Sequence, residues 1–202
     1  MSNWPITLAM TGASGAQYGL RLLQCLLQSN REVYLLLSKP ARLVIDMETD
    51  LELPSRRADI ATYLLERYGG KPAQLRLFGR EEWTAPPASG SARIDAMVVC
   101  PCTTATLSAI ANGASRSLIE RAADVMLKER RKLIVVPRET PLSSVHLRNM
   151  LTLADAGAVV LPANPGFYHQ PTSIEALVDF IVARILDHLD VDHQLMPRWA
   201  DD

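Results

Sequence analysis

A glycine-rich turn near the N-terminus contains the first residues that are suited to binding a ligand. Gly12, Gly15 and Gly19 follow a short apolar run that starts at Pro5, and a helical pattern comes after them. Glycine permits a sharp turn and a close approach to a ligand, and the first N–H groups of a helix favour an anion. The turn therefore predicts a phosphate site. Its spacing matches neither the dinucleotide fingerprint nor a P-loop, and an ordinary strand-to-helix connection is the alternative.

A second turn, rich in hydroxyl groups, repeats this pattern later in the chain. Residues 103–106 follow the apolar run 95–101 and precede another helical segment. Because open parallel sheets bind ligands at the carboxyl ends of their strands, both turns can face one crevice. Ser38 ends a third apolar run, at the position where NAD-binding folds place an acidic residue, which argues against NAD.

Charged side chains form a further group of candidates. Glu48 lies near the C-terminal end of a predicted helix over 40–49, where the helix dipole disfavours a carboxylate, so it is either functional or simply solvated. Arg121 and Lys128 lie seven residues apart on one face of a predicted helix over 117–129. Arg138 and Glu139 end the strand that starts at residue 132, and they are either functional or an ordinary solvated ion pair.

Three aromatic or basic residues lie in loops or at the edge of a helix. Trp83 opens a loop over 83–91 that is rich in Pro, Ala, Ser and Gly, and this loop is either a lid over a ligand or an exposed loop anchored by the tryptophan. Tyr168 lies in an aromatic loop over 164–171. Arg184 lies at the edge of the apolar stripe of the last predicted helix, where it can direct its guanidinium to an anion or stay on the surface.

The elements that must position these residues alternate between strand and helix. Apolar runs near residues 5–10, 32–38, 75–78, 95–101, 132–137 and 157–162 predict strands, and helical stripes lie between them. This order predicts a doubly wound, Rossmann-like α/β fold with a mostly parallel sheet and helices on both faces. The last helix, capped by Thr172 or Ser173, has its apolar stripe at Ile174, Leu177, Val178, Ile181, Ile185 and Leu189.

Composition limits the classes of function. The 202 residues are 48% hydrophobic and carry a net charge of −1, which fits one domain over 1–202, with a core at about 4–190 and a tail at 191–202. The near-neutral charge argues against a nucleic-acid partner. Its three cysteines and four histidines have no metal-ligand spacing, so no metal is expected. No run is long enough for a membrane span and no secretory signal is recognised, which predicts a cytoplasmic protein.

Four motifs in the same order resemble those of the UbiX-type flavin prenyltransferases, formerly called 3-octaprenyl-4-hydroxybenzoate carboxy-lyases. They are Thr11-Gly-Ala-Ser-Gly-Ala16, Arg121-Ala-Ala-Asp-Val-Met-Leu-Lys-Glu129, Pro137-Arg-Glu-Thr-Pro141 and Phe167-Tyr-His-Gln-Pro171. The resemblance implies transfer of a dimethylallyl group from dimethylallyl phosphate to N5 and C6 of reduced FMN without a metal. The product would serve a UbiD-type decarboxylase, in ubiquinone synthesis or aromatic acid metabolism. The resemblance also implies a trimer-based homo-oligomer, commonly a dodecamer, in which neighbouring chains supply some of the site cations.

The resemblance also assigns expected roles to individual residues. FMN would be bound by Gly12, Ala13, Ser14, Ser38, Thr103, Thr104, Ala105, Thr106 and Arg138. The prenyl donor would be bound by Trp83, Ser89, Arg121, Lys128, Glu139, Tyr168 and Arg184. The catalytic candidates are Ser14, Glu48, Lys128 and Glu139. The family's turn commonly reads Ser-x-Lys-Thr, whereas Ala105 stands at the lysine position here, which removes one expected contact.

Two other functions are compatible with part of this pattern. Flavin-dependent cysteine decarboxylases share the fold, but they use a histidine base, a Pro-Ala-Ser-Ala-Asn-type turn and a Pro-x-Met-Asn segment that this chain lacks. A non-catalytic FMN carrier would need the flavin turns but not Arg121, Lys128, Tyr168 and Arg184. These four residues favour the prenyltransferase.

Overall fold

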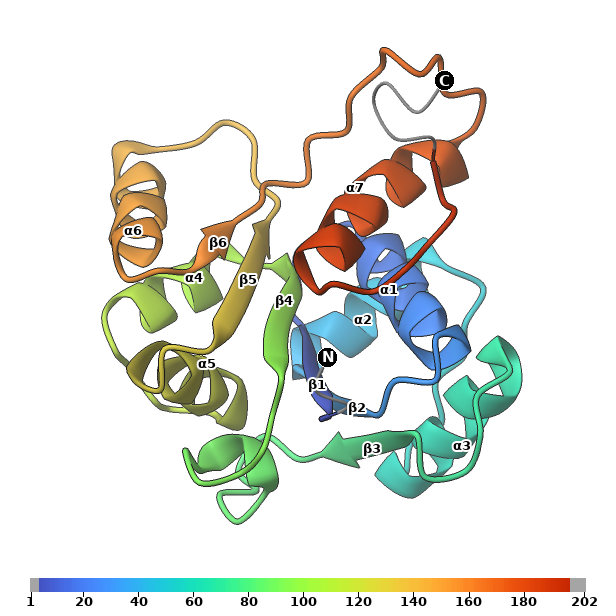
Figure 1. Cartoon of the computed structure of the whole chain (residues 1–202), viewed down its shortest axis with the longest axis horizontal. Helices are drawn as coiled ribbons and strands as arrows, with labels where there is room; N and C mark the ends of the chain where they lie inside the picture. Colours follow the sequence, from blue (N-terminus) through green and yellow to red (C-terminus); the bar gives the residue numbers. More distant parts are fainter. Residues whose placement is uncertain (1–3, 197–202) are drawn as a thin grey trace.

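Six strands form one parallel sheet in the computed structural model, which describes residues 4–196 (Figure 1). The strands are β1 (Ile6–Met10), β2 (Val33–Leu37), β3 (Leu75–Phe78), β4 (Ala96–Cys102), β5 (Lys132–Pro137) and β6 (Val159–Val160). Their order in the sheet is β3-β2-β1-β4-β5-β6, and each described pairing is parallel. The chain winds outward in both directions from β1 and β4. The predicted doubly wound α/β fold is confirmed.

Helices cover both faces of this sheet (Figure 1). One face carries α1 (Ala16–Gln28), α2 (Lys39–Glu48), α3 (Arg57–Tyr68) and α7 (Ile174–His188), whose apolar residues join one core cluster. The other face carries the 3₁₀ turn η1 (Pro86–Ala88), α4 (Thr104–Ala111), α5 (Leu118–Lys128) and α6 (Ser144–Asp155), which contribute to a second cluster. The sheet therefore separates α7 from α5.

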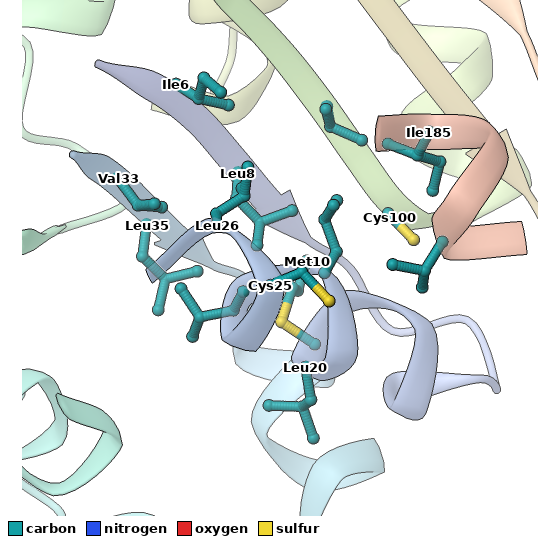
Figure 2. Packing of buried hydrophobic residues seen from close by; sticks show 14 of the residues in the cluster. Ile6, Leu8, Met10, Leu20, Cys25, Leu26, Val33, Leu35, Cys100 and Ile185 are labelled. Atoms are coloured by element: carbon teal, nitrogen blue, oxygen red, sulfur yellow. The ribbon is translucent and has the colours of Figure 1, made fainter. Parts of the chain in front are cut away.

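The central strand β1 is buried on both sides, as its continuous apolar sequence predicts. Ile6, Leu8 and Met10 point toward α1 and α7, where Figure 2 shows them with Leu20 and Leu26. Successive strand residues alternate between faces, so Ala9 packs into the second cluster. Both faces of β1 thus contribute to the hydrophobic core.

Gly19 allows α1 to lie close to the sheet. A Cβ atom at this position would come within 2.3 Å of the Cys100 carbonyl oxygen in β4. The third glycine of the turn therefore serves helix packing and brings the start of α1 close to the end of β4.

Several boundaries differ from those expected from the sequence. The helix between the last two predicted strands begins at Ser144, where Ser143 caps it, and the last strand is reduced from 157–162 to Val159–Val160. Ser173 rather than Thr172 caps α7, because its side chain accepts a hydrogen bond from the Ala176 N–H. The next residue, Ile174, is 72% exposed and does not belong to the buried stripe.

The segment after α7 turns back onto the protein. Val191 is buried in the first core cluster, and Leu195 packs against that cluster. The part of the predicted 191–202 tail beyond residue 196 lies outside the described residues. Within residues 4–196 no helix is both long and apolar enough to cross a membrane.

Candidate functional site

A cavity of about 300 Å³ lies at the carboxyl ends of the central strands. The residues that follow β1, β2, β3 and β4 line it together with the start of α5. They are Thr11, Gly12, Leu36, Leu37, Ser38, Lys39, Pro40, Phe78, Gly79, Arg80, Thr103, Ala105, Thr106, Ser117, Leu118, Ile119 and Glu120. The expectation that the two turns face one crevice is therefore confirmed, at the edge where parallel sheets bind ligands.

Hydrogen bonds join the two turns directly. Thr11 donates its hydroxyl to the Pro101 carbonyl at 2.8 Å and accepts the Thr103 N–H at 2.8 Å. Thr103 in turn caps α4 by accepting the Thr106 N–H at 3.1 Å. The cavity wall contributed by β1 and β4 is thus braced by threonine hydroxyls.

Gly12 and Ser38 shape the opposite wall. A Cβ atom at Gly12 would lie 2.3 Å from the Pro40 Cβ, so only glycine lets the β1 turn approach the start of α2 this closely. Ser38 caps α2 by accepting the Ala41 N–H at 3.1 Å. The glycine that the sequence singled out is therefore required by close packing at the cavity wall.

The carboxylate of Glu48 occupies the N-terminus of α1. Its Oε2 accepts the N–H groups of Gly15 at 2.8 Å and Ala16 at 2.9 Å. An anion of the chain itself therefore takes two of the N–H groups at the turn where the sequence predicts a phosphate. Partial burial would raise the pKa of Glu48, but the Ser14 hydroxyl, the two N–H groups and the charge of Arg138 together lower it.

Arg138 extends over the same turn. Its Nε donates to the Ser14 carbonyl at 3.1 Å, and the two residues line an adjoining hollow of about 500 Å³ with Glu48. Glu139 points to another hollow, of about 290 Å³, that Arg138 also borders. Among residues 4–196 no Arg138–Glu139 ion pair forms, although a pair at this strand end was the ordinary alternative.

A second group of predicted site residues lies between α5 and the loop around η1. Arg121 donates its Nε to the Ala88 carbonyl at 3.1 Å and pairs with Asp124 at 2.9 Å. Lys128 pairs with Glu129, and its Nζ would lie 2.9 Å from a Cβ atom at Gly90. Arg121 and Lys128 therefore share the helix face expected from their spacing, and this face is turned toward the loop.

The loop over 83–91 was expected to be either a lid over a ligand or an exposed loop anchored by Trp83, and its packing differs from the second of these. Trp83 is 48% exposed, whereas Ala85, Pro87 and Ala88 are buried. The sequence did not predict the 3₁₀ turn η1, at which Ala85 and Ala88 pack against the second core cluster. The loop is therefore anchored by η1 and not by the tryptophan.

A third group lies beside α7. Tyr168 contacts Phe180 with ring centroids 5.8 Å apart, and His169 stacks on the same ring at 5.4 Å. Arg184 follows Phe180 by one helical turn and so projects from the same side of α7. Its guanidinium NH1 pairs with Asp187 at 2.6 Å.

The second and third groups lie on different faces of the sheet. Lys128 ends α5 and lies about 15 Å along the helix from Leu118, which lines the cavity. Arg184 belongs to α7 and Tyr168 packs on Phe180 of the same helix, on the opposite face of the sheet from α5. The cavity therefore brings together five candidate flavin residues, and the candidate donor residues are divided between two faces. The five are Gly12, Ser38, Thr103, Ala105 and Thr106, whereas Ser14 and Arg138 line the adjoining hollow.

Sequence reasoning missed part of the cavity lining. Phe78 ends β3, Gly79 and Arg80 follow it, and Ser117 and Glu120 belong to the start of α5. The Leu118 N–H donates to the Arg80 carbonyl at 2.7 Å, which joins these two segments. The rule that ligands bind beyond carboxyl strand ends could have identified the residues after β3.

Burial makes the cysteines poor candidates for chemistry. Cys100 and Cys102 are buried in β4, and burial raises the pKa of both thiols, that of Cys102 to about 12. A protonated thiol is neither a good nucleophile nor a metal ligand. Across residues 4–196, no three His, Cys, Asp or Glu side chains gather in a metal-binding cluster.

Comparison with known proteins places the chain in a family. The flavoprotein family model matches residues 1–186. Flavin prenyltransferase UbiX of Pseudomonas aeruginosa is 61% identical over 97% of this chain and 94% of that protein. The chain belongs to the UbiX-type flavin prenyltransferases. The resemblance found in the four sequence motifs is confirmed.

Two solved structures are close to this fold over nearly their whole length. AnUbiX (PadA1), in complex with FMN and dimethylallyl pyrophosphate, superimposes with a TM-score of 0.86 at 43% identity and covers 97% of both chains. A dodecameric FMN-dependent UbiX-like decarboxylase from Escherichia coli O157:H7 gives a TM-score of 0.84 at 38% identity, covering 96% of this chain and 98% of that one.

Proposed function

We propose that this flavin prenyltransferase joins the dimethylallyl group of dimethylallyl phosphate to N5 and C6 of reduced FMN. The product, prenylated FMN, would serve a UbiD-type decarboxylase in ubiquinone synthesis or aromatic acid metabolism. The observation that carries the proposal is the match to flavin prenyltransferases along nearly the whole chain, with the cavity at the switch point of the sheet. FMN is the flavin of this family, and a solved relative was crystallised with it.

The cavity wall has hydrogen-bonding groups suited to FMN. Gly12 keeps the β1 turn close to the start of α2 at the wall, while Ser38, Thr103 and Thr106 supply hydroxyl groups there. Ala13, Ser14, Thr104 and Arg138 complete the proposed binding set from the same two turns and the end of β5. Ala105 presents only a methyl group, so the neighbouring threonines would supply the polar contacts of this turn.

The donor residues suit an allylic phosphate. The bond between the allylic carbon and the phosphate oxygen breaks as the carbon joins the flavin, and phosphate leaves with the bonding electrons. Arg121, Lys128 and Arg184, with Ser89 and Tyr168, would stabilise the charge on that phosphate. Trp83 would wall the prenyl chain, because an aromatic face stabilises a developing allyl cation.

Reduced FMN supplies the nucleophilic N5, and the chain must handle the proton released on bond formation at C6. Glu139 lies beside Arg138 in the chain at the end of β5, and Ser14 and Glu48 adjoin the α1 turn. We assign proton transfer to these three residues, with Lys128 assisting the leaving phosphate. Two backbone N–H groups hold the carboxylate of Glu48 in place.

The complete site would require neighbouring copies of the chain. The donor residues lie on two faces of the sheet, and a relative with 38% identity forms a dodecamer. A homo-oligomer would bring Tyr168 and Arg184 of one copy to the cavity of another. We therefore propose a trimer-based assembly, most simply a dodecamer.

The proposal is tested by the mass of the flavin. Anaerobic incubation with reduced FMN, dimethylallyl phosphate and a chelator should release phosphate and give a flavin heavier by one five-carbon unit. Oxidised FMN is the control, because its N5 lacks the nucleophilic electron pair. Dimethylallyl pyrophosphate, the ligand of AnUbiX, identifies the preferred donor when tested in parallel. Unchanged flavin mass with both donors, or carbon dioxide release from a cysteinyl peptide, would contradict the proposal.

A further inference from the structure

Three polar side chains at the end of the last helix and in the segment after it form a hydrogen-bonded chain that ends at Arg184. Arg184 NH1 donates to Asp187 Oδ2 at 2.6 Å, one helical turn further along α7. Asp187 Oδ1 lies 3.1 Å from His193 Nε2, in the segment that follows the helix. One carboxylate therefore bridges a guanidinium and an imidazole.

The imidazole is fixed at both nitrogens. His193 Nδ1 accepts the Leu195 N–H at 3.4 Å, so in the neutral ring the proton lies on Nε2 and is donated to Asp187. The side chain of His193 is only 6% exposed, compared with 21% for Asp187 and 51% for Arg184. The exposure of the side chains therefore increases from the buried imidazole, through the carboxylate, to the guanidinium. The buried ring can hold the carboxylate in place, and the carboxylate can hold the guanidinium.

This arrangement suits a residue that must present a charge. An arginine carries five N–H donors, and the contact with Asp187 uses only NH1, which leaves the other side of the planar group to an anion. A long exposed side chain loses much rotamer freedom when it binds, and a partner that fixes it beforehand lowers that cost.

We propose that Asp187 and His193 are positioning residues that hold the Arg184 guanidinium ready for the phosphate of the prenyl donor. The inference rests on the proposed function, which assigns Arg184 to that phosphate. Asp187 and His193 were not among the expected site residues, and neither would touch the donor or the flavin.

Binding of the donor to the full assembly tests this directly. The protein loaded with oxidised FMN is titrated calorimetrically with dimethylallyl phosphate, so that no reaction follows. Asp187→Ala should weaken donor binding about tenfold and His193→Ala about fivefold, in line with other groups that orient a binding side chain. His193→Gln, whose amide N–H can reach Asp187, should restore most of the affinity. FMN affinity should stay unchanged in all three variants.

Asp179 provides a matched control on the same helix. Its carboxylate binds Arg21 at 2.7 and 3.1 Å and is 20% exposed, close to the 21% of Asp187, but it does not contact Arg184. Asp179→Ala should lower the melting temperature as Asp187→Ala does, yet leave donor binding within about twofold of the unmodified protein. Equal weakening by both variants would mean a general loss of stability and would overturn the proposal.

A double-mutant cycle separates positioning from an independent role. Without Arg184 there is nothing to position, so adding Asp187→Ala to Arg184→Ala should change donor affinity no further. An additive loss, or tighter binding in Asp187→Ala, would overturn the proposal, since the latter would mean that Asp187 competes with the phosphate. If the unmodified protein forms no prenylated flavin, the proposed function itself fails; normal product with unchanged binding in Asp187→Ala refutes the positioning role alone.

Discussion

The carboxyl edge of the sheet and the outer side of α7 contain candidate site residues of different kinds. At the sheet edge, Gly12, Ser38 and Thr103 line one cavity, and backbone contacts and helix caps hold all three. Beside α7, Tyr168 and Arg184 are 61% and 51% exposed, and no neighbouring wall encloses them within the described chain. The first region is enclosed within one copy, whereas the second is open on its outer side.

This contrast indicates how the two ligands would be recognised. A flavin that fits a preformed cavity depends on backbone geometry, so its binding should tolerate the loss of a distant charge. A phosphate bound by long cationic side chains depends on those charges, because each charge-assisted hydrogen bond contributes about 1.5–3 kcal/mol. Variants should therefore separate flavin binding from use of the donor.

The largest separation is expected from the donor cations. Lys128→Ala and Arg184→Ala should each lower kcat/KM for dimethylallyl phosphate by about 10- to 150-fold, which corresponds to the loss of one charged hydrogen bond. FMN affinity, measured by fluorescence quenching, should stay nearly intact. Lys132→Ala is the control, because Lys132 pairs with Asp190 and with the His188 carbonyl, away from the cavity lining. Loss of flavin in both donor variants would mean that these cations bind the FMN phosphate.

A smaller effect, on flavin binding rather than on use of the donor, is expected at the turn over residues 103–106. Thr103→Ala removes the cap of α4 and should weaken FMN binding about fivefold, since a lost cap costs about 1 kcal/mol. The KM for the donor at saturating FMN should change less. Ser143→Ala removes the cap of α6, outside the cavity lining, and serves as the matched control. Equal loss of flavin in both variants would show that stability, rather than the cavity wall, is being measured.

The smallest effect concerns Glu48 and depends on pH. Burial opposes its charge, but the hydrogen bonds at the start of α1 prevail and lower its pKa below the ordinary value. A lowered folded-state pKa contributes stability above the unfolded pKa, and this is lost as the pH falls through the folded value. Glu48→Gln should therefore be less stable at neutral pH by about 0.3–1 kcal/mol, the range for a charge at a helix terminus, with the gap closing in acid.

Urea unfolding at several pH values measures that gap. Glu66→Gln, on the exposed side of α3, controls for the loss of one negative charge. A difference between the Glu48 variant and the unmodified protein that stays constant from neutral to acidic pH would contradict the account of this carboxylate.

The sheet and its binding edge could be predicted from the sequence because they depend on local patterns. A strand covered on both faces is apolar without interruption, as β1 and β4 are, and small or hydroxyl residues follow where the chain must turn. Once the strands are assumed to be parallel, their ends share one edge. Gly12 and Thr103 were therefore found together although 91 positions separate them.

Other parts of the site depend on contacts that no local pattern encodes. Glu48 binds the start of α1 from 33 residues away, and its sequence neighbours suggest only a helix end. The stretch around Pro86–Ala88 is rich in loop formers, yet its small side chains fit beneath α5 as η1. Likewise, Ile174 fits the spacing of the apolar stripe, but it lies in the first turn of α7 and is exposed instead of packing into the core.

The central claim, that the site is divided between copies, is tested most directly by mixing two inactive variants. Lys128→Ala and Arg184→Ala chains are coexpressed with different tags, and the mixed oligomers are isolated and assayed for prenylated FMN. If the two cations meet only across an interface, random assembly leaves about a quarter of the sites intact, and activity should rise to about that fraction of the unmodified level. Activity no higher than that of the single variants would contradict the account, since both cations would then act within one chain.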